Sequence, residues 1–270
     1  MRFALVALML FASITLAHAG FQQVYHYVTI SIRPDASAHV LEEFRLFIDG
    51  NDSLRFYDSV LGLNDISAWK NVTGLSNMRL HFDTRFARLS DIRIRSQQRE
   101  GCNPFAGTCY GTVRAEYEVG SGGNGSFVGR TLAKPRTYNY TINPRALSYE
   151  TSEQGDIFLS EGTRLTINLP NDATITSLNP FPDYFETTTL PVRGVSSLAW
   201  RGPNALAKFS LVFQREDNLG TEVLQFFSSL QGRIASLFSS LEGLALALMA
   251  LIAISAFILL RRYNEARKRA

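Results

Sequence analysis

The residues of this 270-residue chain that could do chemistry are few and widely spaced. Its only two cysteines, Cys102 and Cys109, flank the turn formers Asn103, Pro104 and Gly107. Thiol–disulfide oxidoreductases use C-x-x-C, and a zinc site needs more Cys or His at ligand spacing. In an oxidising compartment the pair is therefore expected to form a structural disulfide across a hairpin tip, which stabilises the fold by roughly 2 to 3 kcal/mol.

The histidines are also isolated from one another. His26, His39 and His81 have no partner at i,i+2 or i,i+4, so we expect each to be satisfied by local hydrogen bonds and predict no metal or cofactor. The chain has no G-x-S-x-G elbow and no recognisable Ser/His/Asp or Cys/His arrangement. Carboxylates could still converge in the fold, but nothing in the sequence favours catalysis, and we predict that the protein is not an enzyme.

A glycine-rich string, "GSGGNGS" at residues 120–126, formally matches the dinucleotide fingerprint. That fingerprint requires a helix to begin at its third glycine, so that the helix N-terminus meets the pyrophosphate. Gly129 and Pro135 break any such helix. The segment is therefore interpreted as a flexible loop or linker.

Two further sets of residues could make surface contacts. Four N-x-S/T sequons offer acceptors for N-glycosylation if the host modifies exported proteins, at Asn51, Asn71, Asn124 and Asn139. The densest basic cluster consists of Arg79, Arg85, Arg88, Arg93, Arg95 and Arg99. Such a cluster could grip an anionic polymer or lipid headgroups. Acids nearby, including Glu116 and Glu118 on the presumed partner strand, favour internal neutralisation instead.

The ends of the chain place these residues outside the cytoplasm. Residues 1–19 combine Arg2, an apolar run and Ala17-His18-Ala19, which is typical of a cleaved signal peptide. Residues 243–260 carry no charge and span about 27 Å as a helix, as expected for one transmembrane helix. The tail, 261–270, holds five basic residues and one acid, so the positive-inside rule assigns it to the cytoplasm.

This topology changes the meaning of the basic composition. The whole chain has a net charge of +3. Without Arg2, the five basic residues of the tail and Glu265, it holds 21 basic and 23 acidic residues. The exported part is therefore close to neutral, and the sequence does not indicate a nucleic-acid partner.

Residues 220–242 form a predicted amphipathic stem helix that continues into the membrane. Its apolar residues recur at alternating steps of four and three, which is typical of a helix-association seam. The seam consists of Val223, Phe227, Leu230, Ile234, Leu237 and Leu241. The stem could bind a second copy or a partner helix, pack on its own ectodomain, or lie along the bilayer surface.

The exported body is predicted to be mainly β because its apolar residues alternate. Residues 24–48 read as a hairpin in which Glu42 is the one charged residue on the apolar face of the second strand. "DIRIRS" and "TVRAEYEV" predict a second antiparallel pair around the cysteines, with matched charges on its wet face. No amphipathic helix is predicted before residue 221, and residues 50–78 show no clear pattern.

The density of short strands and turn residues favours an antiparallel β-sandwich. We favour two domains, 20–120 and 138–219, joined by the linker 121–137, over one larger sandwich. With "ISIRPDASAHVLEEF", "GTRLTINLPNDATITSLNPFP" and the single C-terminal span, the chain resembles membrane-anchored β-sandwich ectodomains of archaea and bacteria. The resemblance implies fold and topology only, since no catalytic motif accompanies it.

The sequence thus predicts a single-pass cell-membrane protein with an extracytoplasmic ectodomain that acts in binding or assembly. Its expected partners are the lipid bilayer, a protein or glycan outside the cell, and a second copy through the stem. An anchored hydrolase and an accessory subunit of a transport or secretion complex are the alternatives.

Overall fold

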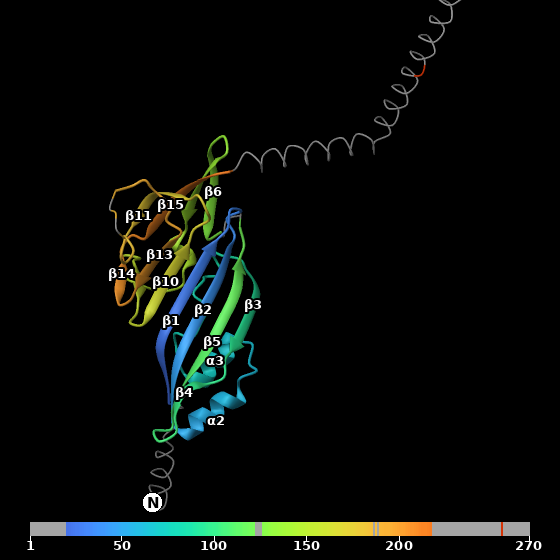
Figure 1. Ribbon diagram of the computed structural model, residues 1–270, viewed down its shortest axis with the longest axis vertical. Coiled ribbons are helices and arrows are strands. Elements are labelled where there is room, and N and C mark those ends of the chain that lie inside the picture. Colours follow the sequence, from blue (N-terminus) through green and yellow to red (C-terminus); the bar gives the residue numbers. More distant parts are fainter. Residues whose placement is uncertain (1–19, 122–125, 186, 188, 218–254, 256–270) are drawn as a thin grey trace, which may run out of the picture. The chain divides into compact units, whose positions relative to one another are not determined.

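The computed structural model describes residues 20–121, 126–185, 187, 189–217 and 255, and within them the chain is mainly β (Figure 1). The predicted signal peptide and tail lie outside these residues, as do the seam residues of the stem, Asn124 and, apart from Ser255, the predicted transmembrane helix. Among the described residues, no helix is long and apolar enough to cross a membrane.

The largest sheet has seven strands in the order β13-β10-β1-β2-β5-β3, with β4 also paired to β5. Its strands are β1 (Gly20–Ile32), β2 (Ala38–Asp49), β3 (Leu89–Ser96), β4 (Glu100–Asn103), β5 (Thr108–Val119), β10 (Thr163–Asn168) and β13 (Ser197–Arg201). The predicted hairpin of β1 and β2 is confirmed, as is the antiparallel pairing of β3 with β5. The pair β1–β10 is parallel, which departs from the wholly antiparallel prediction.

Two smaller sheets complete the described part of the chain. A five-stranded sheet has the order β12-β11-β15-β7-β6, and a three-stranded sheet has the order β14-β9-β8. Their strands are β6 (Val128–Lys134), β7 (Thr137–Ile142), β8 (Glu150–Thr151), β9 (Ile157–Leu159), β11 (Thr174–Asn179), β12 (Val192–Arg193), β14 (Asn204–Leu206) and β15 (Ser210–Glu216). A 3₁₀ turn, Pro144–Ala146, follows β7.

Because β10 and β13 join β1 in the large sheet, segments on both sides of the glycine-rich string share one sheet.

Two helices, α2 (Asn51–Ser59) and α3 (Ile66–Thr73), occupy the stretch without a clear pattern, so the prediction of no helix before residue 221 is wrong. Both are too short to be stable alone, and their periodicity spans barely two turns. Local signals mark both ends of α3. At its N-terminus the Asp65 carboxylate accepts the Ser67 N–H, and at its C-terminus Gly74 adopts the left-handed conformation.

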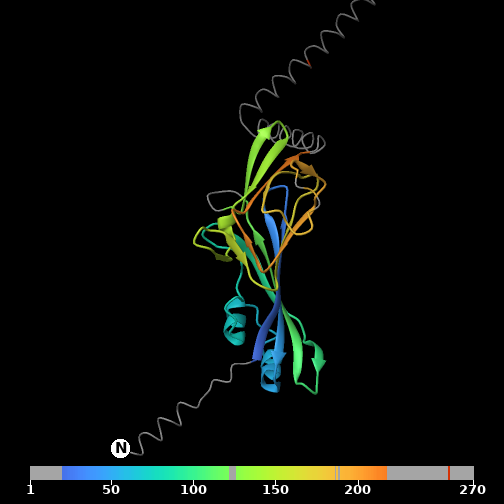
Figure 2. The same cartoon turned by 90° about the vertical axis from the view of Figure 1, so that its left-hand side faces the viewer.

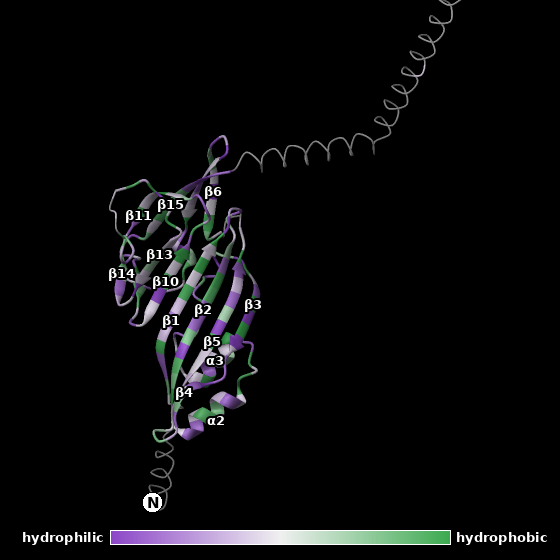
Figure 3. Cartoon of the chain, in the orientation of Figure 1, coloured by the Kyte–Doolittle hydropathy of each residue, from purple (hydrophilic) through white to green (hydrophobic). Residues whose placement is uncertain are grey.

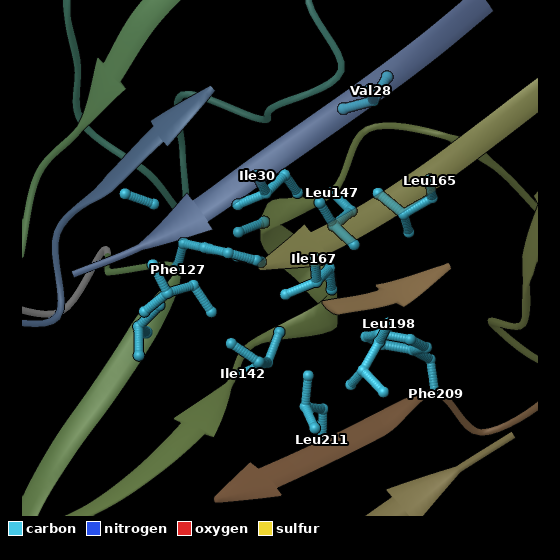
Figure 4. Packing of buried hydrophobic residues seen from close by; sticks show 14 of the residues in the cluster. Val28, Ile30, Phe127, Ile142, Leu147, Leu165, Ile167, Leu198, Phe209 and Leu211 are labelled. Atoms are coloured by element: carbon cyan, nitrogen blue, oxygen red, sulfur yellow. The ribbon is translucent and has the colours of Figure 1, made fainter. Parts of the chain in front are cut away.

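The inward face of the large sheet carries two separate hydrophobic cores. Figure 3 shows the alternation of polar and apolar residues along its strands that produces this face. The first core lies between the large sheet and the five-stranded sheet. Figure 4 shows Ile30 of β1, Ile167 of β10 and Leu211 of β15 converging there, and all three are fully buried.

The second core lies where α2 and α3 cover the same face of β2 and β5. Phe44 and Leu46 of β2 pack there with Tyr57 of α2 and Trp69 of α3. The Tyr57 hydroxyl donates to the backbone carbonyl of Gln97 at 2.7 Å and accepts the Thr112 N–H at 3.1 Å. In Figure 2, strands β1 and β2 run continuously from the region of the first core to that of the second.

Candidate functional site

A cluster of buried polar residues, His26, Glu42 and His81, lies on the inward face of the large sheet. His26 comes from β1, Glu42 from β2, and His81 from the segment between α3 and β3. Their exposed fractions are only 2%, 0% and 5%. We call these three residues the His–Glu–His cluster.

The cluster occupies the boundary between the two cores. On β2, Val40 belongs to the first core and Phe44 to the second, with Glu42 between them on the same face. On β5, Tyr117 belongs to the first core and Ala115 to the second. The polar cluster therefore interrupts what would otherwise be one continuous apolar face.

Glu42 is the centre of the cluster because both of its carboxylate oxygens accept hydrogen bonds. Oε2 accepts from His26 Nε2 at 3.1 Å and from His81 Nδ1 at 2.8 Å. Oε1 accepts from the His81 backbone N–H at 2.8 Å and from the Tyr117 hydroxyl. Since an ionised carboxylate only accepts, both ring nitrogens act as donors in this arrangement.

Burial and these contacts set the charge states of the cluster. Burial alone would raise the pKa of Glu42, but the neighbouring His81 and His26 and their hydrogen bonds outweigh it and hold that pKa well below its ordinary value. Burial lowers the pKa of His26. Burial, with the charge of Glu42, raises the pKa of Tyr117 well above its ordinary value. At neutral pH Glu42 is therefore a fully buried carboxylate whose charge is stabilised by four hydrogen-bond donors.

A small cavity of about 20 Å³ adjoins the cluster and is lined by His26, His81, Gln23, Tyr149 and Thr163, among others. The Tyr149 hydroxyl and Gln23 Oε1 are buried without a hydrogen-bond partner among the described residues. A cavity of this size holds about one water molecule. A water there would satisfy polar atoms that otherwise carry a desolvation cost.

The opposite face of the sheet carries a groove of about 440 Å³ over β2, β5 and β3. We call it the arginine groove. Its lining residues are His39, Leu41, Arg93, Arg95, Ser96, Gln97, Arg114 and Glu116.

The arginines predicted to be neutralised internally fall into two groups. Arg85 pairs with Asp83 and Arg99 with Asp58, and Arg79 donates to a backbone carbonyl. Arg88, Arg93 and Arg95 are exposed and make no ion pair within the described part of the chain.

The cross-strand register explains this difference. Arg93 lies opposite Glu116, but that carboxylate is also 3.5 Å from His39. Arg95 lies opposite Arg114, a like charge that is itself bonded to Glu43. The predicted charge match between the strands thus holds in register for one pair and fails for the other.

The predicted disulfide between Cys102 and Cys109 is present, with Cα atoms 4.1 Å apart, and closes the β4–β5 hairpin. Among the sequons, Asn51 and Asn71 are exposed on α2 and α3, whereas Asn139 is half-buried in β7 and its Oδ1 is buried without a partner. Ser53 and Thr73, the hydroxyl residues of the two exposed sequons, are buried.

Sequence reasoning missed the His–Glu–His cluster, and the expectation of local partners is wrong for all three histidines, since even His39 bonds Glu118, which is 79 residues away. His26 and His81 meet at Glu42, which is 16 and 39 residues away in the chain. The signal was the charged residue on the apolar face of β2, together with a histidine in phase with Val28 and Ile30 on β1. Comparisons with protein-family models and with curated proteins find no match to this chain, so its function has to be inferred from these residues.

Proposed function

We propose that the protein is a membrane-anchored module that works in binding or assembly outside the cytoplasm and holds an acidic partner in the arginine groove. In this proposal residues 20–219 form a β-sandwich ectodomain, the stem sets its distance from the bilayer, and residues 243–260 anchor it through a single pass.

The observation that carries the proposal is the pair Arg93 and Arg95, exposed side by side along β3 without ion-pair partners in the described residues. A guanidinium group binds carboxylate, sulfate or phosphate oxygens through two parallel hydrogen bonds. Two such groups on one strand, with Gln97 beside them, offer a row of donors to an anionic glycan or an acidic protein surface.

The wider face supports the same function. On β1, which pairs with β2 beside the groove, the rings of Tyr25 and Tyr27 stack with their centroids 4.2 Å apart, and Tyr27 is 41% exposed. Aromatic and arginine side chains are the residues most enriched in binding surfaces. An open sheet face that carries both kinds of side chain suits an extended partner better than a small molecule.

A hydrolytic function has weaker support. The His–Glu–His cluster is the best candidate for acid–base chemistry, but its cavity of about 20 Å³ admits a water molecule and not a substrate. The arginine groove also holds a histidine–carboxylate contact, His39 with Glu116 at 3.5 Å, but both side chains are open to water and no enclosed substrate pocket surrounds them in the described part of the chain.

The test is crosslinking and mass spectrometry on native membranes with the full chain, comparing two double charge reversals. Arg93→Glu/Arg95→Glu changes the groove, and Arg55→Glu/Lys70→Glu makes the same charge change at exposed positions on α2 and α3. We expect the unmodified chain to crosslink a partner through the groove. The groove variant should lose most of that product, while the helix variant keeps it.

Equal crosslinking by both variants, or crosslinks confined to other faces, would contradict the proposal. Recovery of several subunits of one transport or secretion complex would instead support the accessory-subunit alternative. Recovery of copies of this chain alone, joined through the stem, would leave the groove without a partner and also count against the proposal.

A further inference from the structure

We propose that the His–Glu–His cluster binds one divalent transition-metal ion of the zinc class. This inference is independent of the arginine groove, which lies on the other face of the sheet. It rests on three features of the described residues: the donor atoms, the groups that hold them, and the cavity beside them.

The donor atoms match a known preference. His26 Nε2, His81 Nδ1 and Glu42 Oε2 all lie within 4.8 Å of one another. Two imidazoles and one carboxylate form a donor set that zinc uses when one coordination position stays open. With metal–ligand bonds of about 2.0–2.1 Å, tetrahedral ligands lie roughly 3.3 Å apart. The two contacts to Oε2, at 3.1 and 2.8 Å, are close to that value.

The carboxylate is held in the orientation that a ligand needs. The Tyr117 hydroxyl and the His81 backbone N–H both bond Oε1, which leaves Oε2 as the atom facing the two rings. Such contacts from outside the ligand set fix ligands and raise metal affinity. The His81 backbone is itself fixed, because its carbonyl accepts the Ser148 N–H at 2.8 Å.

The cavity supplies the fourth position. The unpartnered Tyr149 hydroxyl belongs to a side chain only 9% exposed, and it lines the cavity with both histidines. A metal-bound water in this space would bond Tyr149, Gln23 Oε1, or both. To present a lone pair to the metal, each imidazole gives up the proton on the nitrogen that faces Glu42 and carries its remaining proton on the other ring nitrogen.

The third histidine of the ectodomain provides a matched control. His39 lies on β2, three residues before Glu42, but on the opposite face, where it contacts Glu118 and Glu116. A substitution there changes the histidine count and net composition in the same way as a change in the cluster, without touching the proposed ligands.

The experiment titrates Zn²⁺ into the chelator-treated full chain in mild detergent, in competition with a chromophoric chelator. We expect one Zn²⁺ per chain and a rise in the thermal unfolding midpoint. His26→Gln and His81→Gln should each weaken binding by more than about 100-fold, since loss even of a supporting contact costs 10- to 100-fold. His39→Gln should bind as the unmodified chain does.

Co²⁺ bound to the unmodified chain gives a second measurement that does not depend on a variant folding. A four-coordinate ion should show visible absorption that Zn²⁺ abolishes. The proposal is overturned if the unmodified chain binds no Zn²⁺, if Co²⁺ stays six-coordinate, or if His39→Gln weakens binding as much as His26→Gln.

Discussion

The two hydrophobic cores share strands β1, β2 and β5 but are covered in different ways. The first core is closed by another sheet, whose strands β7, β11 and β15 come from distant parts of the chain. The second is closed by two short helices that follow β2 directly. The comparison teaches that the same alternating strand pattern can pack against a second sheet or against helices. The pattern alone does not reveal which of the two covers the apolar face.

The His–Glu–His cluster at the boundary differs from the two cores in what a substitution costs. Apolar residues on each side can be exchanged at the cost of lost packing, but a buried carboxylate that loses its donors carries the full cost of desolvation. Coupling between the cores can be measured, because each contains one of the two tryptophans: Trp200 in the first and Trp69 in the second.

The largest expected effect is that of Trp69→Ala. Deleting this fully buried ring should lower the free energy of unfolding by about 3–5 kcal/mol. Because continuous strands join the cores, Trp200 fluorescence should report a lower urea midpoint as well. The control is Phe56→Ala, which removes an exposed ring from α2. An unchanged Trp200 midpoint would mean that the cores unfold independently.

Loss of the disulfide should be the next largest effect. Cys102→Ala/Cys109→Ala opens the short loop and should lower the unfolding free energy by roughly 2 to 3 kcal/mol. Cys109 belongs to the second core, so Trp69 fluorescence is the relevant probe. Reduction of the unmodified chain should lower the urea midpoint by the same amount. If neither the substitutions nor reduction changes the midpoint, the disulfide does not stabilise the second core.

Gly111→Ala tests how tightly the second core is packed. A Cβ at this position of β5 would lie 2.5 Å from the Tyr57 ring, so the helix has to move or the ring has to leave its hydrogen bonds. We expect a loss of about 1–3 kcal/mol in urea unfolding. Gly62→Ala, where the new Cβ has no atom within 4 Å, should leave the urea midpoint unchanged. Equal urea midpoints for the two variants would show that α2 can move away from β5 without loss of stability.

The smallest expected effect is a pH dependence on the outward face of the large sheet. Bidentate hydrogen bonds from Arg33, at 2.6 and 2.7 Å, lower the pKa of Glu118. A lowered folded-state pKa contributes stability that is present above the unfolded value of about 4.3 and is lost as the pH falls through the folded value. Arg33 is 47% exposed, so the contribution is at most about 1 kcal/mol.

The measurement compares the unmodified chain with Arg33→Gln across pH. The two should differ in unfolding free energy at pH 7 and converge in acid. A difference that persists after Glu118 is protonated would assign the effect of Arg33 to packing of its aliphatic stem.

Local patterns predicted much of the fold. The alternation in β1, β2, β5 and β10 and the turn at Pro34–Ser37 are visible in the sequence because each face of these strands has one environment. The helices α2 and α3 were missed because their stability comes from contacts made by Leu54, Tyr57 and Trp69, which are tertiary. The parallel partner of β1 was missed because register over such a sequence separation leaves no local trace.

The candidate site shows the same division. Glu42 was recognisable as the exception on an apolar face, yet its donors His26 and His81 are joined to it only by the folding of β1 and of the segment after α3. The arginines were recognisable as a cluster. Which of them would remain unpaired depends on the register of β3 against β5, in which Arg95 meets Arg114.

The parallel pairing of β1 with β10 has a consequence for the order in which the protein is made. Ser31 and Asn168, which bond across this pair, are 137 residues apart. A chain that emerges N-terminus first can zip β1 onto β2 at once, but the other side of β1 stays open until Asn168 has been synthesised. An open strand edge is a template for pairing with another chain. Nascent and C-terminally truncated forms that end before Thr163 are therefore the species most prone to aggregate.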